Sequence, residues 1–212
     1  TVVGGSGNDW IHGDRHNAAS SLVINGYGDA DFIALDPSLH GDDVLLGGSG
    51  EDILVGDAGD DYIDGGTEDD VMWGDDVYID GQYHGNDTML GGTGNDSAIG
   101  GGGDDEIYGG EGDDIIWGDE SRYDGMNEIL LAGEYHGKDK IYGGAGKDVI
   151  IAGGNDDVIY GGDGDDTIWG DSKFGTNTFS TDSPWLSFQY HGNDTIYGGA
   201  GKDIVNAGAG ND

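Results

Sequence analysis

Aspartate recurs every nine residues along most of this sequence, and each copy follows the same arrangement of glycines. Residues 4–12 read GGSGNDWIH, and the pattern G-G-x-G-x-D-x-U-x, in which U is apolar, returns down the chain. Carboxylate oxygens are the ligands that hard cations such as calcium prefer. The regular spacing therefore predicts rows of metal-binding carboxylates. The recurring aspartates are Asp9, Asp43, Asp52, Asp61, Asp70, Asp87, Asp96, Asp105, Asp114, Asp139, Asp148, Asp157, Asp166, Asp194, Asp203 and Asp212.

Each nine-residue unit divides into a six-residue turn and a three-residue strand. Glycines allow positive φ in the turn and leave backbone carbonyls free to converge beside the aspartate. Side chains alternate between the two faces of a strand, so the apolar middle residue of each strand faces inward. Two units would close one turn of a flattened coil, with neighbouring turns about 4.8 Å apart. The inward column is predicted to be Ile11, Leu45, Leu54, Ile63, Met72, Met89, Ala98, Ile107, Ile116, Ile141, Ile150, Ile159, Ile168, Ile196 and Val205.

Composition points to cations as the necessary partner. The 212 residues include 44 Asp and Glu against 7 Lys and Arg, a net charge of −37, together with 47 Gly. Self-repulsion and glycine entropy both oppose a compact state, so the bare chain is expected to be disordered. Nucleic acids and anionic membranes would repel such a chain. The sequence has no cysteine for a disulfide or a thiolate metal site, and we expect neither a signal peptide nor a membrane anchor.

The repeated G-G-x-G-x-D-x-U-x motif resembles the nonapeptide of the RTX family, the hemolysin-type calcium-binding repeats. The resemblance covers all of the chain except four insertions. It implies an all-β fold, a right-handed parallel β-roll built of nine-residue half-turns. It also implies that the sixteen aspartates and turn carbonyls hold calcium between neighbouring turns, and that the protein is secreted by bacterial type I secretion.

Four substitutions depart from the glycine pattern. Glu68 and Asn155 replace the fourth-position glycine, and Ala152 and Ala207 replace the first. Asparagine tolerates left-handed backbone geometry, so Glu68 is the substitution expected to disturb its local site most.

Insertions interrupt the nine-residue count at residues 15–39, 76–83, 120–135 and 172–190. Each complete block between them holds four units, an even number of half-turns. All insertions are therefore expected to leave from one edge of the roll, on every second turn, and the other edge is expected to be smooth. Residues 1–212 are expected to form one continuous repeat array that is part of a longer chain.

The borders of the insertions are also regular. They open with Gly-Asp, at Asp14, Asp75, Asp119 and Asp171, and close with His-Gly, at His40, His84, His136 and His191. The four opening aspartates are predicted to be additional calcium ligands. The histidines would suit a transition metal or a general base, but no fixed carboxylate or nucleophile partner is evident. A ring that hydrogen-bonds the loop base, or stacks on its tyrosine neighbour, is the favoured interpretation.

The strands that enter from the smooth edge are apolar on their outward side as well. Trp73, Trp117 and Trp169 are predicted to stack in one outward column, which Trp10 does not fit. Such a patch exceeds what a soluble monomer normally exposes, so either the apolar inserted loops or a second copy of the chain should cover it. We favour the loops.

Calcium binding coupled to folding is the function that these features predict. The roll would hold up to about fourteen calcium ions, with extracellular affinities of about 10⁻⁴ to 10⁻³ M. The chain is expected to be a non-enzymatic structural or adhesive segment of a secreted or cell-surface bacterial protein. A self-assembling filament or surface-layer subunit is one alternative. A carbohydrate-binding or enzyme-associated module, with a surface glycan at the loop-bearing edge, is the other.

Overall fold

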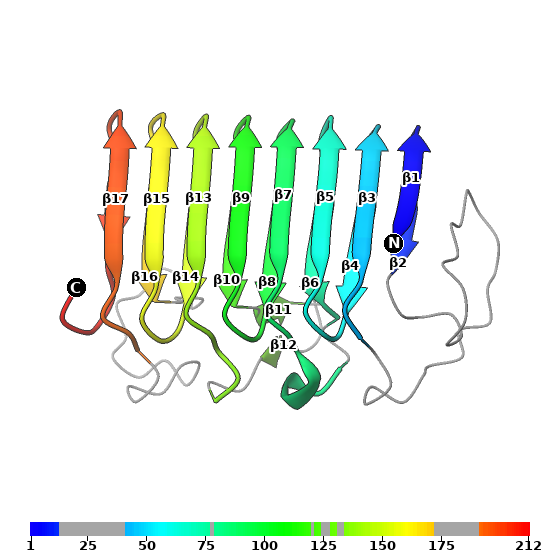
Figure 1. The fold of residues 1–212 in the computed structure, drawn as a ribbon. Helices are drawn as coiled ribbons and strands as arrows, with labels where there is room; N and C mark the ends of the chain where they lie inside the picture. The colour runs from blue at the N-terminus through cyan, green and yellow to red at the C-terminus, as the bar shows by residue number, and fades with distance from the viewer. Residues whose placement is uncertain (13–40, 77–78, 120, 124–127, 131–133, 172–190) are drawn as a thin grey trace.

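The computed structural model describes residues 1–12, 41–76, 79–119, 121–123, 128–130, 134–171 and 191–212. Its body is a coil of two facing parallel sheets of eight strands each, and consecutive strands of the coil alternate between the sheets (Figure 1). We call them the front and back sheets. This arrangement confirms the predicted parallel β-roll.

The front sheet holds, in spatial order, β1 (Val2–Ser6), β3 (Val44–Ser49), β5 (Tyr62–Thr67), β7 (Thr88–Thr93), β9 (Glu106–Glu111), β13 (Lys140–Ala145), β15 (Val158–Asp163) and β17 (Thr195–Ala200). The back sheet holds β2 (Trp10–His12), β4 (Ile53–Asp57), β6 (Val71–Asp75), β8 (Ser97–Gly101), β10 (Ile115–Asp119), β14 (Val149–Gly153), β16 (Thr167–Asp171) and β18 (Ile204–Asn206). Every pair of neighbours in these sheets is parallel, and each strand is in register with the strand two nonapeptides away, in the next turn of the coil.

The core is one column of middle residues between the two sheets, as the alternation predicts. From Ile11 to Ile168 each predicted member is 0–1% exposed. Ile196 is only partly buried and Val205 is 47% exposed. The expected burial of Val205 is therefore wrong, because β18 is the last strand of its sheet and has a neighbour on one side only. Val2 also joins the core, at the register position of Leu45.

The two edges of the roll differ, as the even number of half-turns predicts. The smooth edge contains the turns that lead from front to back strands, with Asp9, Asp52, Asp70, Asp96, Asp114, Asp148, Asp166 and Asp203. The loop edge contains the turns that lead back, with Asp43, Asp61, Asp87, Asp105, Asp139, Asp157, Asp194 and Asp212. The described residues that flank the four insertions all lie at the loop edge, which is at the bottom of Figure 1.

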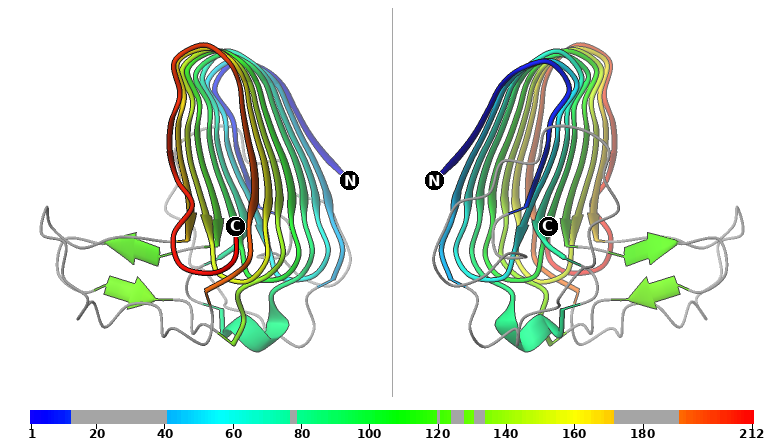
Figure 2. Two further views of the ribbon diagram at one scale, coloured as in Figure 1. Left: turned by 90° about the vertical axis from the view of Figure 1, so that its left-hand side faces the viewer. Right: turned by 90° about the vertical axis from the view of Figure 1, so that its right-hand side faces the viewer.

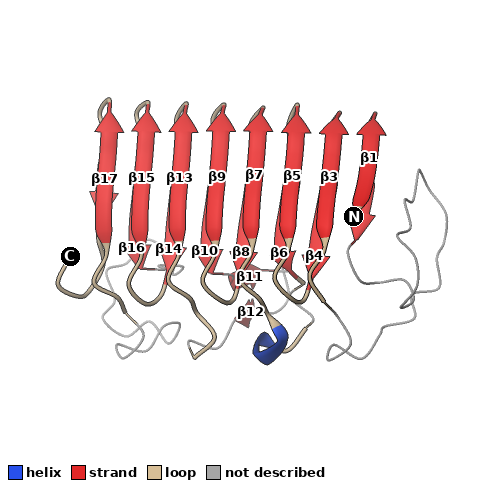
Figure 3. Cartoon of the chain, in the orientation of Figure 1, coloured by secondary structure: helices blue, strands red, loops and turns tan. Residues whose placement is uncertain are grey.

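Two insertions contain regular structure of their own. A 3-10 helix, η2 (Gly81–Tyr83), is capped by the Asp80 side chain and is drawn in blue in Figure 3. Strands β11 (Ser121–Tyr123) and β12 (Glu128–Leu130) form an antiparallel pair in the third insertion. This pair projects from the loop edge on the side of the back sheet (Figure 2).

The outward face of the back sheet carries the predicted tryptophan column. Trp73 lies in register between Val55 and Ile99, and Trp117 lies between Ile99 and Ile151. Val55 and Ile151 are 7% and 8% exposed and the tryptophans are half-buried. A second outward column, which includes Ile53, Ile115 and Ile204, is exposed. That the inserted loops cover the remaining apolar surface stays a prediction.

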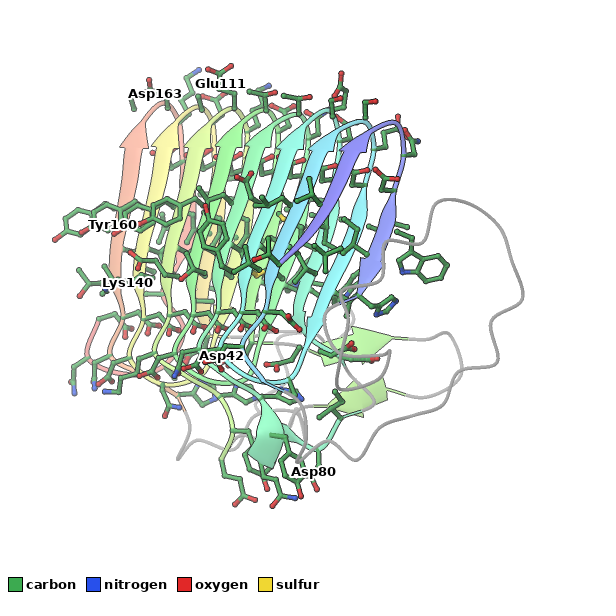
Figure 4. The ribbon with its side chains drawn as sticks, turned by 45° about the vertical axis from the view of Figure 1, so that its right-hand side comes forward. Asp42, Asp80, Glu111, Lys140, Tyr160 and Asp163 are labelled. Carbon is green, nitrogen blue, oxygen red and sulfur yellow. The ribbon has the colours of Figure 1, made fainter. Side chains whose placement is uncertain are left out.

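The outward face of the front sheet carries a stack of four tyrosines that the sequence did not reveal. Tyr108, Tyr142, Tyr160 and Tyr197 have successive ring centroids 4.6, 5.0 and 4.8 Å apart and lie within 6° of parallel. The row runs across the sheet through Tyr160 in Figure 4. The centroid distances match the spacing of neighbouring strands, so the sheet itself sets the stack.

Truncation of a core residue should cost far more than truncation of an outward one. Ile141→Ala, which leaves a cavity in the closed column, should lower the free energy of unfolding by about 2–5 kcal/mol. Ile204→Ala, at a side chain that is 67% exposed, should change it by less than about 1 kcal/mol. Urea unfolding in saturating calcium measures both. Equal losses would contradict a single inward column.

Candidate metal sites

The recurring aspartates form a hydrogen-bonded row along each edge, which we call the inner ladder. The backbone N–H of the aspartate in one turn donates to Oδ1 of the aspartate in the next turn, over 2.6–3.2 Å. Asp52 donates to Asp70 at 2.8 Å on the smooth edge, and Asp105 donates to Asp139 at 2.9 Å on the loop edge. Because one oxygen is used in this way, every carboxylate has the same orientation.

The second carboxylate oxygen has a different environment. The Oδ2 atom is buried without a hydrogen-bond partner in Asp9, Asp52, Asp70, Asp87, Asp96, Asp105, Asp114, Asp139, Asp148, Asp157, Asp166 and Asp194. Burial of an ionised oxygen without compensation costs several kcal/mol. A row of such atoms therefore requires either protonation of the carboxyl groups or a partner that carries positive charge.

First-position glycines keep space open beside these oxygens. A Cβ atom on Gly47 would lie 2.6 Å from Asp52 Oδ2 and 2.5 Å from the carbonyl oxygen of Gly65 in the next turn. Gly4 has the same relation to Asp9 and to Gly47. The cradles at Gly4 and Gly47 thus combine a carboxylate oxygen with a carbonyl oxygen of the neighbouring turn, and a Cβ at either glycine would enter that space.

The donor set fits calcium. Carboxylate and carbonyl oxygens in a flexible arrangement are calcium ligands, whereas zinc would call for nitrogen or sulfur. In the described part of the chain, no three His, Asp or Glu side chains converge on one point. Main-chain carbonyls must therefore complete each site, and the residues present are suited to do so.

Burial raises the pKa of eleven ladder aspartates, namely Asp52, Asp70, Asp87, Asp96, Asp105, Asp114, Asp139, Asp148, Asp157, Asp166 and Asp194. On the smooth edge the pKa of Asp70 and Asp114 is raised to about 7 and that of Asp148 to about 6, in each case chiefly by burial. On the loop edge burial, and then the charge of neighbouring aspartates, raises the pKa of Asp105 and Asp139 well above its ordinary value. Without a bound cation, the folded state therefore disfavours the ionised form of these aspartates.

Comparison with known families decides the identity of the repeat. The family model for the RTX calcium-binding nonapeptide repeat matches residues 1–17, 41–72, 84–116, 142–172 and 192–212, which is more than half of the chain. The chain belongs to this family. It is therefore a calcium-binding repeat module, and RTX repeats of this kind are structural. No curated protein and no solved structure matches the chain.

The departures from the RTX consensus leave the inner ladder intact. Glu68 and Asn155 keep the left-handed backbone of the glycines they replace, with φ of 75° and 70°. Glu68 also accepts hydrogen bonds from Gly50 N, at 3.0 Å, and from the Thr67 hydroxyl. The bonds on both sides of Asp70 remain 2.8 Å, so the hydrogen bonds of the inner ladder are undisturbed there, and an effect of Glu68 on calcium binding stays a prediction. Asp57 is a further departure, not predicted from the sequence, and occupies a left-handed second position with φ of 87°.

An outer ladder of fifth-position side chains runs beside the inner one and was not predicted. Asn86 N donates to Asp60 Oδ1 at 2.7 Å, Asp104 N to Asn86 Oδ1 at 2.7 Å, and Lys138 N to Asp104 Oδ1 at 2.8 Å. These bonds point toward the preceding turn, opposite to the inner ladder. Lysine cannot accept, and Lys138 instead reaches Asp156 through Nζ at 2.8 Å. In the sequence, this outer ladder corresponds to the high frequency of Asn and Asp at the fifth turn position.

The two ends of each described insertion meet at the loop edge. Asp75, Asp119 and Asp171 lie beside the closing histidines of their own insertions, with Oδ2 to Nδ1 distances of 3.2, 2.8 and 2.7 Å. The expected lack of a carboxylate partner is therefore wrong for His84, His136 and His191, because the insertion brings its two ends together. The expected contact with the loop base is confirmed for His84, whose Nε2 lies 3.2 Å from the Ile79 carbonyl oxygen. Asp14 and His40 lie outside the described residues, and a calcium role for the opening aspartates stays a prediction.

A methyl group in one cradle should remove one calcium site. Gly47→Ala is expected to lower the number of bound ions by about one and to destabilise the calcium-bound fold by roughly 1–3 kcal/mol, because the new Cβ displaces Asp52 Oδ2 and the Gly65 carbonyl oxygen. Gly41→Ala is the matched control, since a Cβ there meets nothing within 4 Å. Equilibrium dialysis counts the ions. A full complement in Gly47→Ala would contradict the cradle.

The calcium-free chain should be more structured in acid than at neutral pH. Raised pKa values mean that the folded state binds protons more tightly than the unfolded state. The corresponding stability is present below about pH 4 and is lost as pH rises through the folded values of about 6 for Asp148 and about 7 for Asp70, Asp87 and Asp114. Circular dichroism of calcium-stripped protein should show more β-structure at about pH 4.5 than at about pH 7.5. Identical spectra would oppose this linkage.

Proposed function

We propose that residues 1–212 act as one calcium-triggered folding unit of a secreted bacterial protein, and that the sixteen ladder aspartates are its calcium ligands. The observation that carries the proposal is the row of buried, unpartnered Oδ2 atoms in a fold whose turns are joined through those same carboxylates. The matching RTX repeats support it, because repeats of this family are characteristic of secreted bacterial proteins.

Backbone amides, glycines and apolar side chains have different roles in the proposed calcium-dependent folding. Backbone N–H groups hold each Oδ1 and thereby aim Oδ2 at the carbonyl oxygens of the next turn. Left-handed glycines turn the backbone so that these carbonyls converge. The inward apolar column then packs only when neighbouring turns are in register. Bound calcium would supply positive charge between the turns, so binding energy becomes folding energy.

The expected calcium affinity determines whether the chain folds inside or outside the cell. Extracellular calcium modules bind at about 10⁻⁴ to 10⁻³ M, far above cytosolic calcium, so the chain would remain unfolded inside the cell and fold outside it. Up to about fourteen ions would fit between eight turns on two edges, about +28 against the net charge of −37.

A structural or adhesive extracellular segment is the role we propose for the folded roll. Stacked turns give a stiff array, and the insertions on one edge offer contact surfaces. None of the helices in the described part of the chain is long and apolar enough to cross a membrane.

Self-assembly is a second candidate, favoured by the charge distribution. At the centres of the back-sheet strands the outward positions carry no Asp, Glu, Lys or Arg, and the aspartates that end four of these strands, Asp57, Asp75, Asp119 and Asp171, are buried, although the chain carries −37 overall. A surface without charge is the one on which two copies could meet without repulsion. Light scattering with and without calcium tests this, and a strictly monomeric roll at high concentration would refute it.

Calcium-dependent folding has a direct test. Circular dichroism during calcium titration at neutral pH should pass from a disordered spectrum to a β spectrum, in a cooperative transition. Asp105→Ala should reduce the cooperativity and shift the midpoint severalfold, because it removes both the acceptor of the Asp87 N–H and one buried Oδ2. Full β-structure in excess chelator at neutral pH would overturn the proposal.

A further inference from the structure

We infer that the opening aspartate and the closing histidine of an insertion form a clasp that lets the roll accept an inserted segment of any length without a break in its ladders. The clasp pairs are Asp75–His84, Asp119–His136 and Asp171–His191. They are positioning residues for the loop edge, and this inference does not depend on where the protein folds or what it adheres to.

The clasp lies at one fixed point of the nonapeptide. In an inserted turn, the sequence reads Gly-Asp, then the insertion, then His-Gly-x-Asp, so the extra residues enter between the second and third turn positions. Insertions of eight, sixteen and nineteen residues (76–83, 120–135 and 172–190) all use this point. The isolated bridges of His84, His136 and His191 to the preceding turn fall at equivalent places, at Gly59, Gly103 and Asn155.

Each clasp carboxylate joins three parts of the fold. Asp119 Oδ2 lies 2.8 Å from His136 Nδ1 and accepts from Gly154 N of the next turn at 2.6 Å. Its Oδ1 accepts from Gly137 N, directly after the histidine, at 3.0 Å. Asp171 repeats the set with His191, Ala209 N and Gly192 N. Asp75 lies beside His84 and accepts from Gly102 N of the next turn at 3.1 Å, while its Oδ1 has no hydrogen-bond partner among the described residues.

The clasps are buried, so their contacts are shielded from water. The aspartate side chains are 0–3% exposed, and those of His84 and His136 are 3% and 6% exposed. The next turn provides the space, since a Cβ on Gly101 would lie 2.6 Å from Asp75 Oδ2. A hydrogen bond from an imidazole or backbone N–H to a carboxylate is stronger in such surroundings than on the surface.

Backbone conformation explains why the opening position of an insertion can carry a side chain in place of glycine. In turns without an insertion, the second position is left-handed and is glycine, apart from Asp57. Among described non-glycine residues, only Asp57, Glu68 and Asn155 have positive φ. Asp75, Asp119 and Asp171 therefore have ordinary backbone, which frees the second position to carry a side chain.

The roll continues undisturbed across each clasp. Asp61 N to Asp87 Oδ1, Asp105 N to Asp139 Oδ1 and Asp157 N to Asp194 Oδ1 span the three insertions at 2.8, 2.9 and 3.0 Å, the same as in uninterrupted turns. Asn155 adds a bond from Nδ2 to the His136 carbonyl oxygen at 2.7 Å. The junction thus depends on the clasp and its neighbours, while the insertions differ in length and sequence.

Loop replacement in saturating calcium tests the inference. A chain in which residues 121–134 are replaced by a Gly-Ser linker keeps both members of the clasp. Its Gly137 and Gly154 amides should exchange hydrogen within about threefold of the parent rates. Addition of His136→Ala or Asp119→Ala to that chain should accelerate both amides at least about tenfold, while the Gly112 amide on the smooth edge, bonded to the Ala145 carbonyl oxygen, stays unchanged. Lys138→Ala, at an exposed ion pair in the same turn, is the control and should change none of them.

Two results would overturn the inference. Unaltered exchange after loss of His136 or Asp119 would show that the clasp does not hold the junction. Accelerated exchange or unfolding in the linker chain with the clasp intact would show that the loop sequence holds it. If these variants do not fold, transplantation of an insertion gives an independent answer. In one chain, residues 76–83 are inserted between positions 101 and 102 together with the substitutions Gly101→Asp and Gly102→His, and its Tm should be nearly unchanged. In a second chain, the same residues are inserted between the unchanged Gly101 and Gly102, and its Tm should be lower; equal Tm values for the two chains would likewise refute the clasp.

Discussion

The stacking of turns in this roll depends on how each ladder aspartate uses its two carboxylate oxygens. The Oδ1 atom of a ladder aspartate is held by the backbone N–H of the preceding turn, and Oδ2 is buried against the carbonyl of the next turn. The first contact is an ordinary hydrogen bond, which exists once the turns are stacked. The second is repulsive until a cation joins it, because many carboxylates share the same dry rows. The same residue therefore both joins the turns and repels its neighbours, and in the proposed function bound calcium would offset that repulsion.

This constraint explains the rest of the composition. Glycine is required where a Cβ would fill the cradle, as at Gly47, and where the turn backbone is left-handed, as at Gly48. A large apolar core is unnecessary, because one inward column between two sheets suffices when ions neutralise the edges. The outer ladder of Asn and Asp adds bonds in the opposite direction, so each turn is held to both of its neighbours by side chains as well as by strands.

The loop edge shows how a repeat fold can gain variable segments. An insertion would normally separate the halves of a turn and cost entropy as the loop closes. Here Asp119 and His136 bring the ends together and bind the following turn at Gly154, so the next strand returns in register. The smooth edge has no such need and keeps left-handed glycine at every corresponding second position in the described turns. One edge is thereby reserved for the ladder alone, and the other combines the ladder with added segments.

The sequence by itself determined the period, the inward column, the two unlike edges and the row of aspartates, because each follows from alternation and from counting residues. It also placed Trp73, Trp117 and Trp169 in one column. Only the tertiary structure decided which atoms meet across turns: the direction of the two ladders, the stacking of Tyr108 to Tyr197, and the pairing of Asp119 with His136. These contacts join residues far apart in the chain, and their geometry depends on strand register and backbone φ. A pattern of residue types shows that such groups share an edge, but the direction in which a carboxylate oxygen points is set by the turn stacked upon it.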